Sequence, residues 1–130
     1  MYKAVTRGIR VTVTPRFVEE ESSPDEGRFF FAYTVEITNM STDRVQLRSR
    51  HWRIVDARGR LEEVRGPGVV GQQPVLGPGE TFSYTSRCPL TTPSGTMEGS
   101  YAMVTAKGES FDAAIPAFSL DSPFAKRVMH

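Results

Sequence analysis

Apolar residues recur at every second position along most of this chain, and this period of two constrains the fold more than any other feature. The segments 9–14 and 29–38 both alternate apolar with polar or small residues. Such alternation is typical of β-strands that bury one face. No stretch of ten or more residues shows the 3.6-residue period of an amphipathic helix. The sequence therefore predicts an all-β chain.

Other segments repeat the pattern, and Gly, Pro, Asn, Asp and Ser gather between them. Further strands are expected over 45–55, 61–64, 82–88, 97–106 and 111–115. Pro15 is expected to mark an end or an edge of the first strand, and Pro116 the end of the last. About seven to eight short strands with this spacing predict an immunoglobulin-like or fibronectin type III-like antiparallel β-sandwich.

The third expected strand changes parity halfway along. Val45 and Leu47 lie at odd positions, whereas Trp52 and Ile54 lie at even ones. All four can face the core only across a β-bulge, which we expect near residues 49–51. A Trp in this strand suits the proposed sandwich, in which it would lie in the core.

Size and composition indicate one domain, which we expect to span residues 2–127. The chain has 130 residues, of which 38% are hydrophobic and 24% charged, enough for a core of its own. No apolar run approaches the ~20 residues of a membrane span. No apolar segment follows the first basic residues, and Cys88 is the single cysteine. We therefore expect a cytoplasmic location without membrane association, and a loosely held tail after Leu120.

Charge is balanced overall but unevenly distributed. The net charge of +1 gives no general argument for nucleic acid, which we do not expect as a partner. Five acidic residues lie within 19–26, and six arginines lie within 44–60 against Asp56 alone. Each stretch is explained by a solvated loop or face. Alternatively, the arginines form a strand that faces an anion, because guanidinium matches carboxylate and phosphate geometry.

The longest expected loop contains the pattern GxGxxG at Gly66, Gly68 and Gly71. In dinucleotide-binding folds this pattern opens a helix after a strand, but Pro74 and the antiparallel context argue against that interpretation. Two alternatives stay open. The glycines allow the loop to turn with positive φ, or the loop amides and Arg65 bind the phosphates of a nucleotide or polyphosphate. Gly68→Val separates these alternatives if φ at Gly68 is negative.

Catalytic and metal-binding motifs are not recognisable in the sequence. His51, Cys88 and His130 are far apart, so we expect neither a metal site nor a cofactor. Cys88 has the parity of the apolar residues in its strand, which indicates a buried, inert thiol. Glu62 and Glu63 are adjacent and point to opposite faces of a strand. The sequence predicts no catalytic residue and no enzymatic activity.

Six segments of the chain resemble the ApaG family. They are residues 31–39 (FAYTVEITN), 49–56 (SRHWRIVD), 66–71 (GPGVVG), 76–86 (LGPGETFSYTS), 93–101 (PSGTMEGSY) and 115–120 (IPAFSL). The resemblance covers nearly the whole chain and implies a fibronectin type III-like sandwich in a bacterial cytosolic protein. It also implies a link to cobalt tolerance and magnesium efflux, without an assigned biochemical activity.

The resemblance also bears on partners. Related domains in larger eukaryotic proteins, among them F-box substrate-recognition subunits and a DNA-polymerase-delta-interacting protein, look like protein-binding modules. The family's glycine motif, matched here by Gly66, Gly68 and Gly71, has been suggested to hold a nucleotide pyrophosphate. We therefore expect a non-enzymatic protein-interaction domain with an unidentified protein partner, and any cobalt or magnesium role to be indirect. The alternative is nucleotide or polyphosphate binding at that loop, and the oligomeric state stays open.

Overall fold

The alternating segments pair into two antiparallel sheets that face each other, as a computed structural model describes for residues 1–125. The strands are β1 (Tyr2–Thr6), β2 (Ile9–Phe17), β3 (Phe29–Asn39), β4 (Val45–Asp56), β5 (Leu61–Pro67), β6 (Val75–Leu76), β7 (Thr81–Leu90), β8 (Ser94–Thr105) and β9 (Ser110–Asp121), with the 3₁₀ turns η1 (Glu19–Glu21) and η2 (Pro24–Glu26) between β2 and β3. The predicted fold class, an immunoglobulin-like or fibronectin type III-like antiparallel sandwich, is confirmed.

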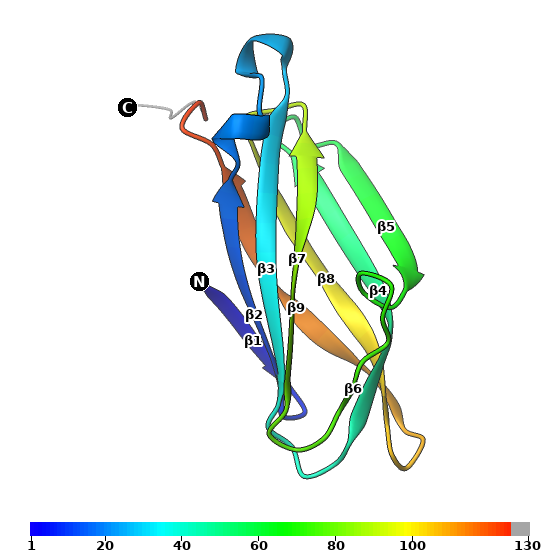
Figure 1. The fold of residues 1–130 in the computed structure, drawn as a ribbon. Coiled ribbons are helices and arrows are strands. Elements are labelled where there is room, and N and C mark those ends of the chain that lie inside the picture. The colour runs from blue at the N-terminus through cyan, green and yellow to red at the C-terminus, as the bar shows by residue number, and fades with distance from the viewer. Residues whose placement is uncertain (126–130) are drawn as a thin grey trace, which may run out of the picture.

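The two sheets contain different parts of the chain (Figure 1). One sheet has the order β1-β2-β3-β7, and the other has the order β5-β4-β8-β9, with β6 paired to the start of β4. Along one side of the sandwich β9 lies beside β1, where the Ala114 amide donates to Thr6 Oγ1 over 3.0 Å. Along the other side β5 and β7 are edge strands. Residues 1–125 form nine strands, because β1 and the two-residue β6 add to those expected.

The core lies between the sheets and is built from the inward half of each alternating pattern. Trp52 is 3% exposed, and the rings of Tyr33 and Phe118 lie 5.2 and 6.0 Å from it, centroid to centroid. Tyr101 is fully buried beside the same indole. The predicted core position of Trp52 is therefore confirmed, and residues from both sheets share this aromatic cluster.

The predicted bulge in β4 is present, slightly earlier than expected. The pairing of β4 with β8 shifts between Leu47 and Ser49. Arg48 is therefore exposed, whereas Arg50 takes the inward parity of Trp52. Two arginines that are two residues apart consequently point to opposite sides of the sheet.

Pro15 lies within β2 rather than at its end. It pairs with Tyr33 of β3 on one side. On the other side β1 pairs with β2 only as far as Val13, so no strand lies beside Pro15 there. The proline therefore leaves no hydrogen bond to β1 unmade, although it has no amide hydrogen. The expectation of an edge position is confirmed, and that of a strand end is wrong.

The expectation that Pro116 ends the last strand is also wrong, because β9 continues to Asp121. The pairing with β8 shifts between Ile115 and Phe118, and a bulge there accommodates a residue without an amide hydrogen. The proline therefore lies inside an irregular part of the strand.

The residues that follow β9 are held in place as far as residue 125. Ser122 is buried and its amide donates to the Pro93 carbonyl over 3.0 Å. The Phe124 ring lies 6.2 Å from that of Phe17. The expectation of a loosely held tail after Leu120 is wrong for 121–125, and residues 126–130 lie outside the described residues. The predicted domain range 2–127 stays a prediction.

The edge strand β5 is the most exposed strand of the second sheet. Leu61 is 53% exposed, and Pro67 ends the strand. Glu62 lies opposite the buried Ile54 but is itself exposed at the edge of the sheet. Its partner edge on the other sheet, β7, carries Pro89. Both free edges therefore contain a residue type that is unfavourable for pairing with another strand.

Candidate functional site

The glycine loop forms a tight β-turn and not the start of a helix. Gly66 belongs to β5, and Val69 and Gln72 exchange two backbone hydrogen bonds of 2.8 Å. Between them Val70 and Gly71 have φ values of 42° and 80°. Two central residues with positive φ define a type I′ hairpin turn. The rejection of a dinucleotide-binding fold agrees with this geometry.

Gly68 is required by both its conformation and its surroundings. Its φ is 61°, and a Cβ there would lie 2.3 Å from the Gln72 carbonyl oxygen. The condition of a negative φ is therefore not met. Gly68→Val would rebuild the loop and cannot test ligand binding by itself.

Several amides of this loop already have backbone acceptors. The amides of Gly68 and Val69 donate to the carbonyls of Arg48 and Gln72, over 2.9 and 2.8 Å. The Arg50 guanidinium lies inside the loop and donates to the carbonyls of Pro67 and Gly68, each over 3.0 Å. The loop thus binds a cation of its own chain through carbonyl oxygens.

The four candidate ligand-binding residues, Gly66, Gly68, Gly71 and Arg65, lie on this one loop and the end of β5. Arg65 is the charged member, with a side chain that is 72% exposed. Its nearest carboxylate is Glu63, 4.0 Å away. Whether these residues bind a ligand stays a prediction.

Arg50 lies beside the hydroxyl groups of the core. Burial raises the pKa of Tyr33 and of Tyr84, and the positive charge of Arg50 offsets part of that rise. The Tyr84 hydroxyl is hydrogen-bonded to the hydroxyl of Tyr101 from the opposite sheet. This buried polar link was not predicted, because strand parity places each tyrosine in the core but does not show which residue it meets.

The other arginines of the stretch 44–60 are separated by the strand geometry. On the outer face of β4, Arg53 is paired with Glu98 over 3.0 Å. His51 is bonded to Glu63 over 2.9 Å on the same face. Six ion pairs join residues in the described part of the chain, and none includes Arg44 or Arg48.

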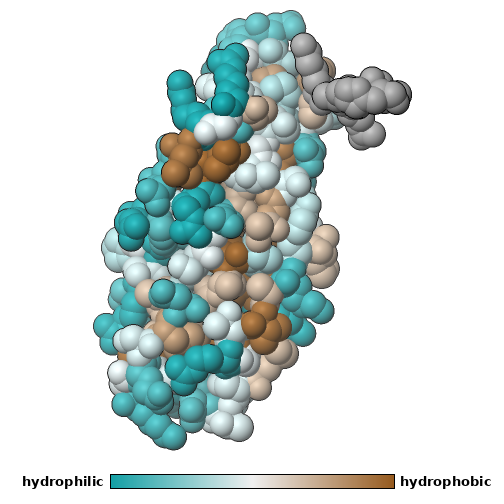
Figure 2. Space-filling model, turned by 180° about the vertical axis from the view of Figure 1, so that it is seen from behind, coloured by the Kyte–Doolittle hydropathy of each residue, from teal (hydrophilic) through white to brown (hydrophobic). Residues whose placement is uncertain are grey.

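The outer face of the five-stranded sheet contains three shallow hollows that adjoin one another. The first shares Arg48 and Val104 with the second, and the second shares Ala102 and Asp112 with the third. We call this continuous depression the sheet trough. Figure 2 views this face, where pale, weakly polar surface and brown, hydrophobic patches lie among teal, hydrophilic side chains.

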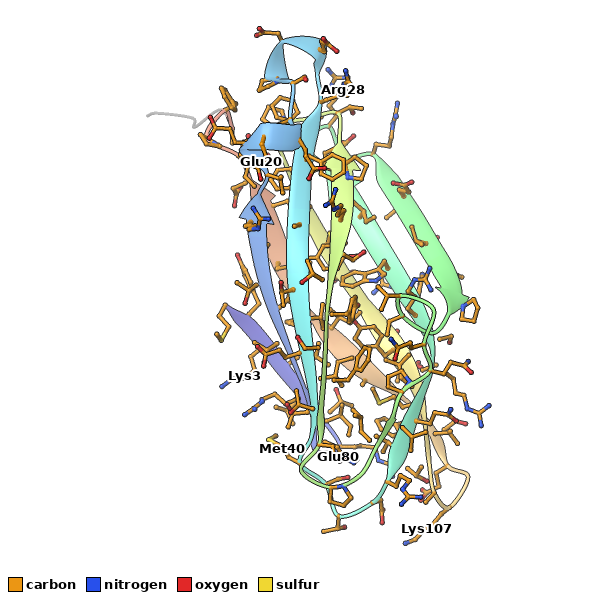
Figure 3. All side chains as sticks on the ribbon, viewed as in Figure 1. Lys3, Glu20, Arg28, Met40, Glu80 and Lys107 are labelled. Atoms are coloured by element: carbon orange, nitrogen blue, oxygen red, sulfur yellow. The ribbon has the colours of Figure 1, made fainter. Side chains whose placement is uncertain are left out.

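The acidic stretch forms the exposed turns η1 and η2 at one end of the sandwich. Figure 3 shows Glu20 and Arg28 at that end and Glu80 and Lys107 at the other. Glu21 is paired with Arg87, and Glu26 with Arg28, each over 2.5 Å. The acidic residues therefore occupy a solvated loop, away from the sheet trough.

The thiol of Cys88 is buried, and burial together with the charge of Glu62 raises its pKa to about 11. His51 lies on the outer face of the other sheet with Glu63 as its partner. The two residues form no nucleophile–base pair, and the predicted buried position of Cys88 is confirmed. His130 lies outside the described residues.

Within residues 1–125, no three or more His, Cys, Asp or Glu side chains gather closely enough to hold a metal ion. No helix in this part of the chain is long and apolar enough to cross a membrane.

Comparisons with known proteins identify the family. The family model described as the ApaG domain matches residues 19–105. Protein ApaG of Methylobacterium sp. (strain 4-46) is 80% identical over 130 residues, all of both chains, and Protein ApaG of Beijerinckia indica subsp. indica is 65% identical over the same extent. The crystal structure of the putative ApaA protein from Bordetella pertussis superimposes with a TM-score of 0.87 and 53% identity, covering 90% of this chain and 95% of that one. This chain belongs to the ApaG family.

Proposed function

We propose that this chain is a non-enzymatic domain that binds another protein through the outer face of its five-stranded sheet. The observation that carries the proposal is the sheet trough, which extends from Val75 on β6 to Asp112 on β9 and reaches Arg65 on β5. A long, open depression on a rigid sheet suits a polypeptide better than a small molecule, whose sites enclose most of the ligand.

The remaining parts of the proposal follow the family resemblance. We place the domain in the cytoplasm, where a single unpaired thiol such as Cys88 is usual. An effect on cobalt and magnesium homeostasis would be indirect and would act through the bound protein. The inert environment of Cys88 supports a binding role over a catalytic one.

The test is photo-crosslinking in the native host cells. Benzoylphenylalanine replaces Val104 in the sheet trough, and in a matched chain it replaces Thr34 on the outer face of the other sheet. We expect a discrete cross-linked protein only from position 104. Mass spectrometry identifies that protein, and calorimetry with both purified components must then show saturable binding. If neither position gives a cross-link, the proposed function is wrong.

A second candidate function is nucleotide or polyphosphate binding at the loop Gly66–Gly71. Its support is the exposed Arg65 side chain and the turn at Val70 and Gly71, whose amides donate to no backbone carbonyl in the described chain. The test is the melting temperature with ATP, GTP, diadenosine polyphosphates and pyrophosphate, each with and without Mg²⁺ or Co²⁺. A ligand at 100 times its Kd adds about 2.7 kcal/mol to the free energy of unfolding. A flat panel would remove this candidate.

A further inference from the structure

The charges that line the sheet trough are strongly one-sided. Arg44, Arg48 and Arg65 line it, and Asp112 is the sole carboxylate among its described lining residues. Arg44 and Arg48 are exposed and belong to none of the ion pairs of the described chain. Guanidinium groups that lack a carboxylate are available to an anionic ligand.

The spacing of these arginines decides which anion fits. Arg44 directly precedes β4 and Arg48 lies within it, so the two are four residues apart, about 13 Å at ~3.3 Å per residue. Arg65 lies opposite His51 on the neighbouring strand, which extends the row to roughly 20 Å. A single phosphate group cannot reach cations so far apart. An extended chain with repeated negative charges can contact all three.

The floor of the trough is suited to a polypeptide. It is formed by small side chains, Ser49, Ser100 and Ala102, which leave room above the sheet. At the Arg44 end Val75, which is 51% exposed, lies across Gln46 from Val104 and offers an apolar contact. A peptide that carries acidic residues and one apolar residue near its end matches these features.

Nucleic acid matches this surface less well, because base stacking requires exposed aromatic rings. Phe111 is the aromatic residue among the described lining residues, and the Arg7 guanidinium covers its ring at 4.8 Å from the centroid. The trough thus offers cations and small side chains without a stacking surface.

We propose that the sheet trough binds an extended acidic segment of the partner protein, through Arg44, Arg48 and Arg65. This inference rests on the proposed protein-binding function and names the chemistry of the partner.

The test measures fluorescence anisotropy of a labelled peptide with the purified full chain. The probe has about ten residues, enough to span the arginine row when extended, and alternates Glu with Thr. A matched peptide alternates Gln with Thr. Arg48→Gln/Arg65→Gln changes the trough, and Arg10→Gln/Arg16→Gln on the outer face of β2 removes the same net charge elsewhere.

We expect saturable binding of the Glu peptide that weakens with salt, and no binding of the Gln peptide. The trough variant should lose about tenfold in affinity, as two exposed ion pairs provide, whereas the β2 variant should stay within twofold. Absence of binding to the Glu peptide, or equal losses in both variants, would overturn the inference. If position 104 still cross-links a protein that binds in calorimetry, only the acidic-segment inference fails and the proposed function stands.

Discussion

The glycine loop yields a sharp prediction, because Gly68 and Gly71 share a positive φ but differ in their surroundings. At Gly71 an added Cβ meets no atom within 4 Å. Gly71→Ala therefore loses only the free energy that an L residue loses in a left-handed conformation, about 1 kcal/mol. At Gly68 the Cβ would also lie 2.3 Å from a backbone carbonyl oxygen, which cannot swing aside. Overpacking of this kind adds about 2 kcal/mol. Gly68→Ala should therefore lower the free energy of unfolding by about 3 kcal/mol in total.

Thermal unfolding followed by circular dichroism measures both variants. For a domain of this size we expect a fall in Tm of about 4 °C for Gly71→Ala and about 12 °C for Gly68→Ala. Equal shifts would refute the argument from the Gln72 carbonyl. Because both substitutions act on the fold, ligand binding at the loop is better tested with Arg65→Gln, whose side chain is largely exposed.

Three further predictions follow from buried or strained groups. Val70→Asn should raise the free energy of unfolding by about 1 kcal/mol in urea titrations, because Val70 is 55% exposed with φ 42° and Asn tolerates that conformation; an unchanged midpoint would contradict this. Tyr84→Phe should lower the free energy of unfolding by about 1–3 kcal/mol, because it leaves the buried Tyr101 hydroxyl without a partner. Adding Tyr101→Phe should lower it by much less than a further ~1–3 kcal/mol. Simple additivity in this double-mutant cycle would refute the coupling. The pKa of Cys88 is raised from 9.0 to about 11, so the folded state keeps its proton longer than the unfolded state. The contribution of the protonated thiol to the free energy of unfolding is fully present below pH 9 and is lost between pH 9 and 11. Stability in that window should fall less steeply in Cys88→Ala, and an unchanged slope would exclude the thiol as the cause.

The fold was largely predictable because most strands bury one face and therefore show a period of two. The β4 bulge followed from the opposite parities of Leu47 and Trp52 alone. β1 and the two-residue β6 were missed because short segments contain too few alternations to stand out. The continuation of β9 past Pro116 depends on a bulge set by its pairing with β8, which sequence parity does not reveal.

The candidate site was only partly predictable. The glycine pattern located the loop, but a Val at a left-handed position hides the type I′ turn, whose usual signal is Asn-Gly. The arginine stretch suggested an anion-facing strand, and parity would have grouped Arg48 with Arg50 had the bulge been absent. The floor of the trough comes from Ser100 and Ala102 on β8, which pairs with β4 across 50 residues of chain. Such distant pairing is a tertiary property.

The edge strands β5 and β7 affect how copies of this chain meet at high concentration. The carboxylate of Glu62 on β5 and Pro89 of β7, which has no amide hydrogen, make it unfavourable for a second copy to add its strand to either edge. Growth of an intermolecular sheet is thereby discouraged at its first step. Side chains on the outer sheet faces can vary without exposing backbone hydrogen-bonding groups, because those groups are already paired within the sheets.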